Sequence, residues 1–350
     1  MSESVAALHP VTPRGDPYLE QRIYIWSPFG TLGTTVALFA FVYGAYLLAA
    51  WIEGAQTLVW TGRHLAFDNG AWPAMVLSLL ICAALGMQRY ARLKDAEDYH
   101  HFAPVFTGGE ATASALGSYA PDDAQLGRAS LAGAIIGILI SAVILNTESI
   151  STRLSQAGTT GWLMIAIILL SVLFARGAEL TRKASASFAI TLRDELKIDL
   201  LRIDKLSVIG RSAARTALIW IVISAIAGLF FVGGDISVVS VATMVTSGAL
   251  GIVIFLRAIM GVHEKIVAAK AAELEHVRCQ IETARAALAQ DDHAATRLQG
   301  LLAYEHRVEQ AQEWPFDQTT IVRVAASTLI VTVPWFGQAV AGYFIEHLAH

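Results

Sequence analysis

The chain has 350 residues, of which 55% are hydrophobic and 15% are charged, and its net charge at pH 7 is −4. Soluble domains usually contain about 25% charged residues, so this composition argues against an ordinary soluble protein. The two cysteines, Cys82 in an apolar run and Cys279 in a charged stretch, argue against a disulfide scaffold. Four prolines and no apolar segment occupy the first 30 residues, which is not the pattern of a cleaved signal peptide.

Seven apolar runs follow, and none of them has a charged residue at its centre. Each approaches the length of about 20 residues with which a helix crosses a bilayer. The sequence therefore predicts an all-α fold, a polytopic membrane helix bundle with seven spans. We place the spans near residues 33–52, 71–87, 129–145, 162–175, 216–232, 237–256 and 324–344.

The basic residues fall almost entirely on one side of these seven spans. The N-terminal tail and every second loop contain 23 of the 25 Lys and Arg residues, whereas the remaining loops contain only Arg63 and Arg153. Because basic residues accumulate in cytoplasmic loops, we expect a cytoplasmic N-terminus and an external C-terminus. The excess of Arg over Lys and the abundance of Ala favour a bacterial inner membrane. A six-span alternative, in which the short fourth run does not cross, would place nine basic residues outside.

The predicted organisation alternates between membrane and cytoplasm. It comprises a cytoplasmic tail (1–32), four spans (33–175) with a partly disordered cytoplasmic loop (88–128), a cytoplasmic amphipathic helix (176–215), a membrane hairpin of spans five and six (216–256), a cytoplasmic antiparallel helical hairpin (257–317), and the last span with a short external tail (318–350). In the amphipathic helix, apolar residues recur at helical spacing at Leu192, Leu196, Leu200, Ile203 and Leu206. We expect this helix either to pack on its own bundle or to lie on anionic lipid or a partner.

The predicted helical hairpin consists of two amphipathic stretches separated by residues 290–293. Its first stretch has apolar residues at Val267, Leu274, Val277, Ile281 and Leu288. Both ends must return to one bilayer face, which favours an antiparallel pair of helices. The same stripe is also a candidate partner-binding arm, for a cytoplasmic protein or for a second copy of the chain. The first helix is the longer one, so part of it must continue the sixth span, tilt, or pack on other protein.

Small residues recur every four positions in two of the spans. Gly133, Gly137 and Ser141 in the third span predict close helix packing. In the sixth span, Ser240, Thr243, Ser247 and Gly251 are open to two interpretations, ordinary packing or a hydroxyl-lined path for a substrate or ion.

No catalytic, cofactor or phosphate-binding motif is recognisable. The densest group of potential metal ligands is 97–101, and no second cluster at ligand spacing accompanies it. We therefore predict no catalytic residue, no cofactor, no metal and no nucleic-acid partner, and a lipid bilayer as the surroundings. The spans lack ionisable residues, which disfavours proton-coupled transport, voltage sensing and a retinal Schiff base.

Four segments of the second half, 198–201, 261–266, 269–274 and 304–317, have distinctive sequences, and the last ends in Glu-Trp-Pro-Phe-Asp. In these segments the chain resembles a group of uncharacterised bacterial inner-membrane proteins. The resemblance implies no activity and assigns no functional residue. Two functions are therefore expected: a membrane scaffold or signalling protein acting through its cytoplasmic helices, or a channel or uncoupled transporter at the sixth span.

Overall fold

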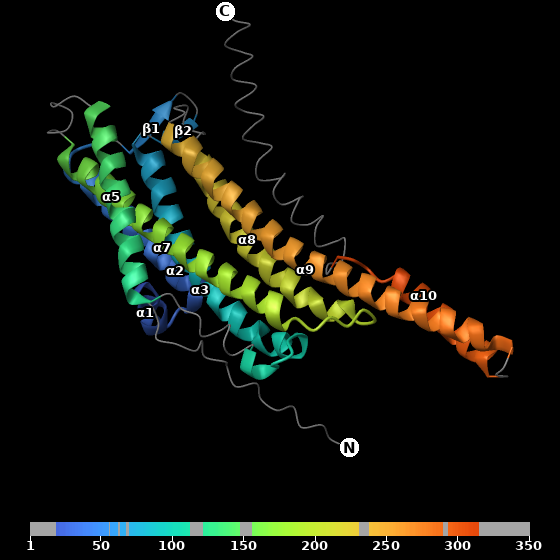
Figure 1. Ribbon diagram of the computed structural model, residues 1–350. Helices are drawn as coiled ribbons and strands as arrows, with labels where there is room; N and C mark the ends of the chain where they lie inside the picture. The colour runs from blue at the N-terminus through green and yellow to red at the C-terminus, as the bar shows by residue number, and fades with distance from the viewer. Residues whose placement is uncertain are drawn as a thin grey trace, which may run out of the picture.

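A computed structural model describes residues 19–55, 57–61, 64–67, 70–112, 122–147, 156–230, 238–289 and 293–314. These residues are almost entirely helical, and Figure 1 shows the long helices gathered into one bundle. The α-helices are α1 (Leu19–Trp26), α2 (Gly30–Ile52), α3 (Ala71–Phe102), α5 (Asp123–Thr147), α7 (Ala157–Glu195), α8 (Ser207–Gly228), α9 (Val238–Ala286) and α10 (Ala294–Glu309). Short 3-10 helices are η1 (Ala103–Val105), η2 (Ile203–Leu206) and η4 (Ala287–Ala289).

Five helices of the described chain are long and apolar enough to cross a membrane, namely α2, α3, α5, α7 and α8. They contain the first four predicted spans and residues 216–228 of the fifth, so the chain is a multi-pass membrane protein. The sixth predicted span falls in the first part of α9, and the seventh, 324–344, lies outside the described residues. Seven spans therefore stay a prediction.

Helices α3 and α8 form the interior of the bundle. About half of the apolar window of each is buried, 56% for α3 and 50% for α8, against 11–17% for α2, α5 and α7. The outer helices instead expose large apolar side chains, including Leu32, Phe41, Leu131, Val143 and Ile165. An apolar surface of this extent is typical of a protein that contacts lipid.

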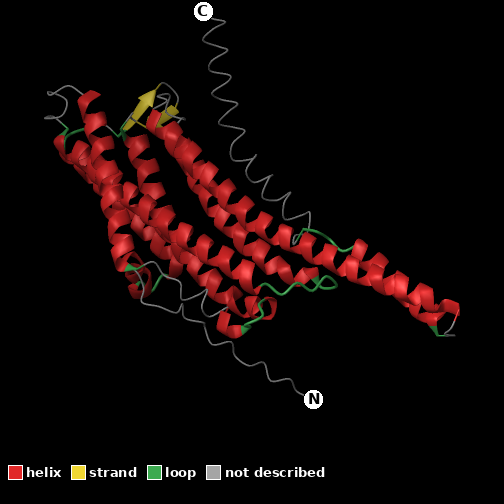
Figure 2. Ribbon diagram, in the orientation of Figure 1, coloured by secondary structure: helices red, strands yellow, loops and turns green. Residues whose placement is uncertain are grey.

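A short β-hairpin lies at the end of the bundle opposite α10, as Figure 2 shows. Strands β1 (Leu58–Thr61) and β2 (His64–Phe67) pair antiparallel, with Leu58 opposite Phe67 and Thr61 opposite His64. Only a loop was expected between the first two spans. The glycine at position 62 of the sequence is the hairpin signal that distinguishes this segment from a plain loop.

At the same end, Glu53 closes the N-terminus of α7. Its carboxylate accepts hydrogen bonds from the backbone N–H of Gly158 and from the hydroxyl of Thr159, the latter at 2.8 Å. A carboxylate is favoured here because the first N–H groups of a helix lack partners within the helix.

A second apolar core lies at the other end of the bundle, and we call it the end module. It is built from the last part of α3, η1, the last part of α7, η2, the start of α8 and the middle of α9, with buried residues Phe102, Val105, Phe106, Leu192, Ile203, Leu206, Val208, Ile209, Val262 and Ile266. Part of the loop predicted to be disordered thus contributes to this core, because Val105 and Phe106 are only 2% and 3% exposed.

The prediction of a single amphipathic helix over 176–215 is wrong. The structure divides this segment: α7 continues to Glu195, an irregular stretch follows, and η2 leads into α8. The chain must break here because α7 runs into the end module and α8 runs back out of it. Phe106 bridges to Leu196 as a single β-pair, and the N–H of Lys197 donates to the carbonyl of Val105 at 2.9 Å.

The segment predicted as an N-terminal tail contains the helix α1. Its Gln21 and Tyr24 are buried, whereas Ile23, Ile25 and Trp26 are exposed. A short helix with one packed face and one exposed apolar face suits the water–lipid boundary.

Candidate functional site: the helical arm

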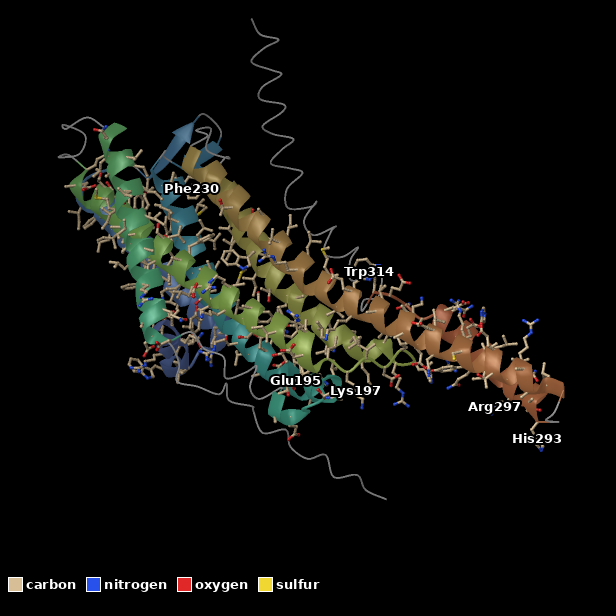
Figure 3. The ribbon with its side chains drawn as sticks, in the orientation of Figure 1. Glu195, Lys197, Phe230, His293, Arg297 and Trp314 are labelled. Carbon is tan, nitrogen blue, oxygen red and sulfur yellow. The ribbon has the colours of Figure 1, made fainter. Side chains whose placement is uncertain are left out.

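The most prominent feature outside the bundle is a pair of helices that projects beyond the end module. We call it the arm and define it as residues 263–289 and 293–314. Figure 1 shows α9 running unbroken from the bundle into the arm, with α10 lying along its distal part. At about 1.5 Å per residue, the 49 residues of α9 extend for about 74 Å. Figure 3 places His293 and Arg297 at the far tip of the arm.

Helix α10 runs antiparallel to α9, as its residue pairings show. Arg278 contacts Glu305, Tyr304 contacts Glu273, and Lys270 contacts Glu313. The unequal lengths of the two predicted helices are thereby explained. The first part of the longer helix continues the bundle, and Val262 and Ile266 are buried in the end module.

The apolar seam between α9 and α10 is narrow. Val277, Ala284, Ala294 and Val308 are at most 3% exposed. Of the five predicted arm residues, Val277 is buried, Leu274 and Ile281 are partly buried, and Val267 and Leu288 are 38% and 43% exposed. Much of the stripe therefore faces α10 within the same chain, and its two ends face outward.

Polar contacts between α9 and α10 accompany this seam. The Arg278 guanidinium donates to Glu305 at 2.8 Å and to Glu309 at 2.9 Å. The Tyr304 hydroxyl donates to Glu273 at 3.0 Å, and partial burial together with this carboxylate raises the pKa of Tyr304. These contacts fix which residues of α10 lie opposite α9.

The base of the arm is closed by the residues that follow α10. The ring of Trp314 stacks on His263 with centroids 4.0 Å apart, and His263 Nδ1 lies 2.9 Å from the carbonyl of Glu313. Lys270 Nζ donates to the carbonyl of Ala311 at 3.1 Å. The Lys265 ammonium bonds to the carbonyl of Arg193 in α7, so the arm base is attached to the end module.

The predicted packing residues of the third span lie between α5 and α7. A Cβ atom at Gly133 would stand 2.6 Å from the carbonyl oxygen of Ser171, and one at Gly137 would stand 2.6 Å from Cα of Ile168. Ser141 is buried, and its hydroxyl has no hydrogen-bond partner among the described residues. It lines a cavity of about 10 Å³ beside Thr160, space for about one water molecule.

Of the four residues predicted to form a stripe in the sixth span, the structure describes the surroundings of one, Gly251. Gly251 is buried against α8, where a Cβ would meet Cβ of Trp220 at 2.9 Å and the carbonyl of Ala217 at 3.2 Å. The side chains of Ser240, Thr243 and Ser247 lie outside the described part of the structure.

Three ion pairs, made by two arginines where the bundle meets the end module, were not anticipated from the sequence. Arg176 of α7 forms a two-pronged contact with Glu20 of α1 at 2.9 and 3.0 Å. Arg215 of α8 bonds to Asp95 at 2.5 Å and to Asp98 at 2.7 Å on α3. Charge spacing along the chain does not reveal such pairs, because their partners are more than 100 residues apart.

Asp98 belongs to the acidic and histidine-rich group considered above as metal ligands, and here it pairs with an arginine. Among the described residues, no three His, Cys, Asp or Glu side chains are placed to hold one metal ion. No family model, no curated protein and no solved structure matches this chain.

Proposed function

We propose that this membrane protein is a scaffold or signalling component that presents the arm to a partner on the cytoplasmic side of a bacterial inner membrane. The arm supports the proposal best. It is a two-helix projection closed by its own seam, and the Lys265 ammonium ties its base to the end module. Leu288 and Leu302 on its surface are 43% and 48% exposed, available for contact with another protein.

The orientation in this proposal rests on the basic residues. The positive-inside pattern assigns the end module and the arm to the cytoplasm, with the N-terminus on the same side and the C-terminus outside. Arg176, Arg215 and Arg257, which precede or follow apolar stretches, agree with this assignment.

Site-specific photo-cross-linking in cells tests the proposal. A cross-linking amino acid at Leu288 or Leu302 is expected to capture one protein partner, or a second copy of the chain. The same amino acid at Leu131 in α5, 63% exposed on the bundle, should not capture that partner.

A shortened arm provides the second half of this test. Replacing residues 282–301 by a short glycine linker leaves Arg278, Glu305 and Tyr304 in the chain, so the proximal seam is retained. With the cross-linking amino acid at Leu302, which this variant retains, the proposal expects normal membrane insertion and loss of the captured partner. Unchanged capture, or no capture at any arm position, would contradict it.

The alternative is a channel or uncoupled transporter with a hydroxyl-lined path along 240–251. The tight contact of Gly251 with Trp220 supports helix packing at that position and so favours the scaffold. Flux measurements in liposomes separate the two proposals. Conductance that Thr243→Leu or Ser247→Leu abolishes would favour the channel.

A further inference from the structure

A small pocket lies in the end module beside the base of the arm. Its walls come from η1, from the stretch after α7 and from η2, with lining residues Pro104, Val105, Lys197, Asp199, Arg202, Lys205 and Leu206. Its volume is about 60 Å³. Since about 10–15 Å³ of such space holds one water, the pocket has room for about four waters, the size of one small anionic group.

Three cations line this pocket against one carboxylate. Lys197, Arg202 and Lys205 form no ion pair within the described part of the chain. One oxygen of Asp199 already accepts the N–H of Leu201 at 3.1 Å. By contrast, the cations that hold elements together, such as Arg176 and Arg215, each contact carboxylates.

We propose that this pocket binds a small phosphorylated anion. Three positive charges and one negative charge leave a surplus of two, which complements the charge of about −1.5 to −2 on a phosphomonoester at pH 7. Lys and Arg are also the side chains that bind phosphate oxygens with charge-assisted hydrogen bonds. The anion would lie where the end module meets the base of the arm, because the lining residues Val105 and Leu206 belong to the same core as Ile266 of α9.

The position of the pocket favours a soluble anion over a lipid headgroup. The pocket lies some way from the predicted fifth span, which begins at Thr216. The first nine residues of α8 and the four residues of η2 separate the two. At about 1.5 and 2.0 Å per residue they extend about 13 and 8 Å. The headgroup layer on one side of a bilayer is only about 5–8 Å thick. The predicted fifth span, 216–232, places the bilayer in this comparison.

Calorimetric titration with inorganic phosphate tests the site, using the full chain in nanodiscs of zwitterionic lipid. Removing one cation, as in Arg202→Gln, is expected to weaken binding by about tenfold or more, since a charge-assisted hydrogen bond to the anion is lost. Combining Lys197→Gln, Arg202→Gln and Lys205→Gln should abolish measurable binding. A matched control removes three exposed arginines of the arm, with Arg285→Gln, Arg297→Gln and Arg307→Gln.

The outcomes decide between the sources of phosphate chemistry. Binding by the wild type and the control but not by the pocket variant supports the site, provided that all three proteins have the same circular dichroism. No binding by the wild type, or equal binding by both variants, overturns it. Retention of anionic lipid that depends on the three cations, without binding of free phosphate, also overturns it. The cross-linking test is independent, so the scaffold and the anion site fail separately.

Discussion

Apolar side chains of α9 face outward in the bundle and inward in the end module, although one helix runs through both regions. In the first part of α9, Ile252, Val253 and Leu256 are 45–48% exposed, whereas Val262 and Ile266 further along are fully buried. The first pattern suits a helix surrounded by lipid tails, and the second suits a helix that excludes water. One continuous helix can therefore pass from lipid into water if its large apolar side chains face outward in the membrane and inward beyond it.

The two regions also differ in what holds their helices together. Helices α5 and α7 approach each other through Gly133 and Gly137, while the end module is filled by large side chains such as Phe102, Phe106 and Leu206. Apolar burial drives little association in lipid, so close backbone approach takes its place. Substitutions at matched positions can test how far this contrast extends.

The largest effect is expected where the two regions meet, at Arg176. Arg176→Met leaves the carboxylate of Glu20, only 13% exposed, without its cation. Breaking a buried pair in this way should cost about 3 kcal/mol. Thermal unfolding in detergent measures the loss. Arg128→Met, at an exposed position, is the control, and an equal loss in both variants would contradict the assignment.

Within the bundle, Gly137→Ala should destabilise the contact of α5 with α7. The new Cβ would lie 2.6 Å from Cα of Ile168, so the helices must separate, at a cost of about 2 kcal/mol. Gly161→Ala in α7 is the matched control, because no atom lies within 4 Å of its added Cβ. The same melting assay applies, and a harmless Gly137→Ala would rule out close packing there.

In the arm, Val308→Ala should open the seam while leaving the bundle intact. Val308 is fully buried, and losing two carbon groups there costs about 1.6 kcal/mol at about 0.8 kcal/mol each. Trypsin cleavage after Arg285 or Arg297 is expected to accelerate, with unchanged melting of the bundle. Leu302→Ala, at an exposed position, should change neither. A lower melting temperature of the bundle would show that the two regions unfold together.

The smallest effect is expected from Tyr304→Phe, which removes one hydrogen bond at a cost of about 1 kcal/mol. Because the pKa of Tyr304 is raised above 10.0, the protonated phenol stabilises the seam below about pH 10. This contribution is lost as the pH rises through the raised pKa. A distance between spin labels on Cys279 and at Arg307→Cys should therefore lengthen at high pH. With Phe at position 304, the same pH dependence should vanish.

Sequence patterns were sufficient to predict the helices that are surrounded by lipid along most of their length. Five apolar runs in lipid became five long helices, because a segment without charges that satisfies its own hydrogen bonds has few alternatives in a bilayer. The spacing of Gly133 and Gly137 pointed to close packing, and both residues lie against α7.

The end module could not be derived in the same way, because its residues come from distant parts of the chain. Val105 and Phe106 stand in a stretch rich in Gly, Ala and Pro, and only the docking of Leu196 beside Phe106 makes them a core. Likewise, Leu192 and Ile203 keep a helical spacing across a segment that is not one helix. The spacing of apolar residues indicates which side chains can share one face of a helix, but it does not show where the chain reverses direction.

The unbroken course of α9 has a mechanical consequence. A helix has a fixed rise per residue and resists bending, so α9 connects its contact with Trp220 in the bundle to the tip of the arm without a hinge. A change in the crossing angle of α8 and α9 moves the tip further than any residue inside the bundle. In the other direction, a load on the tip exerts a torque on the packing at Gly251.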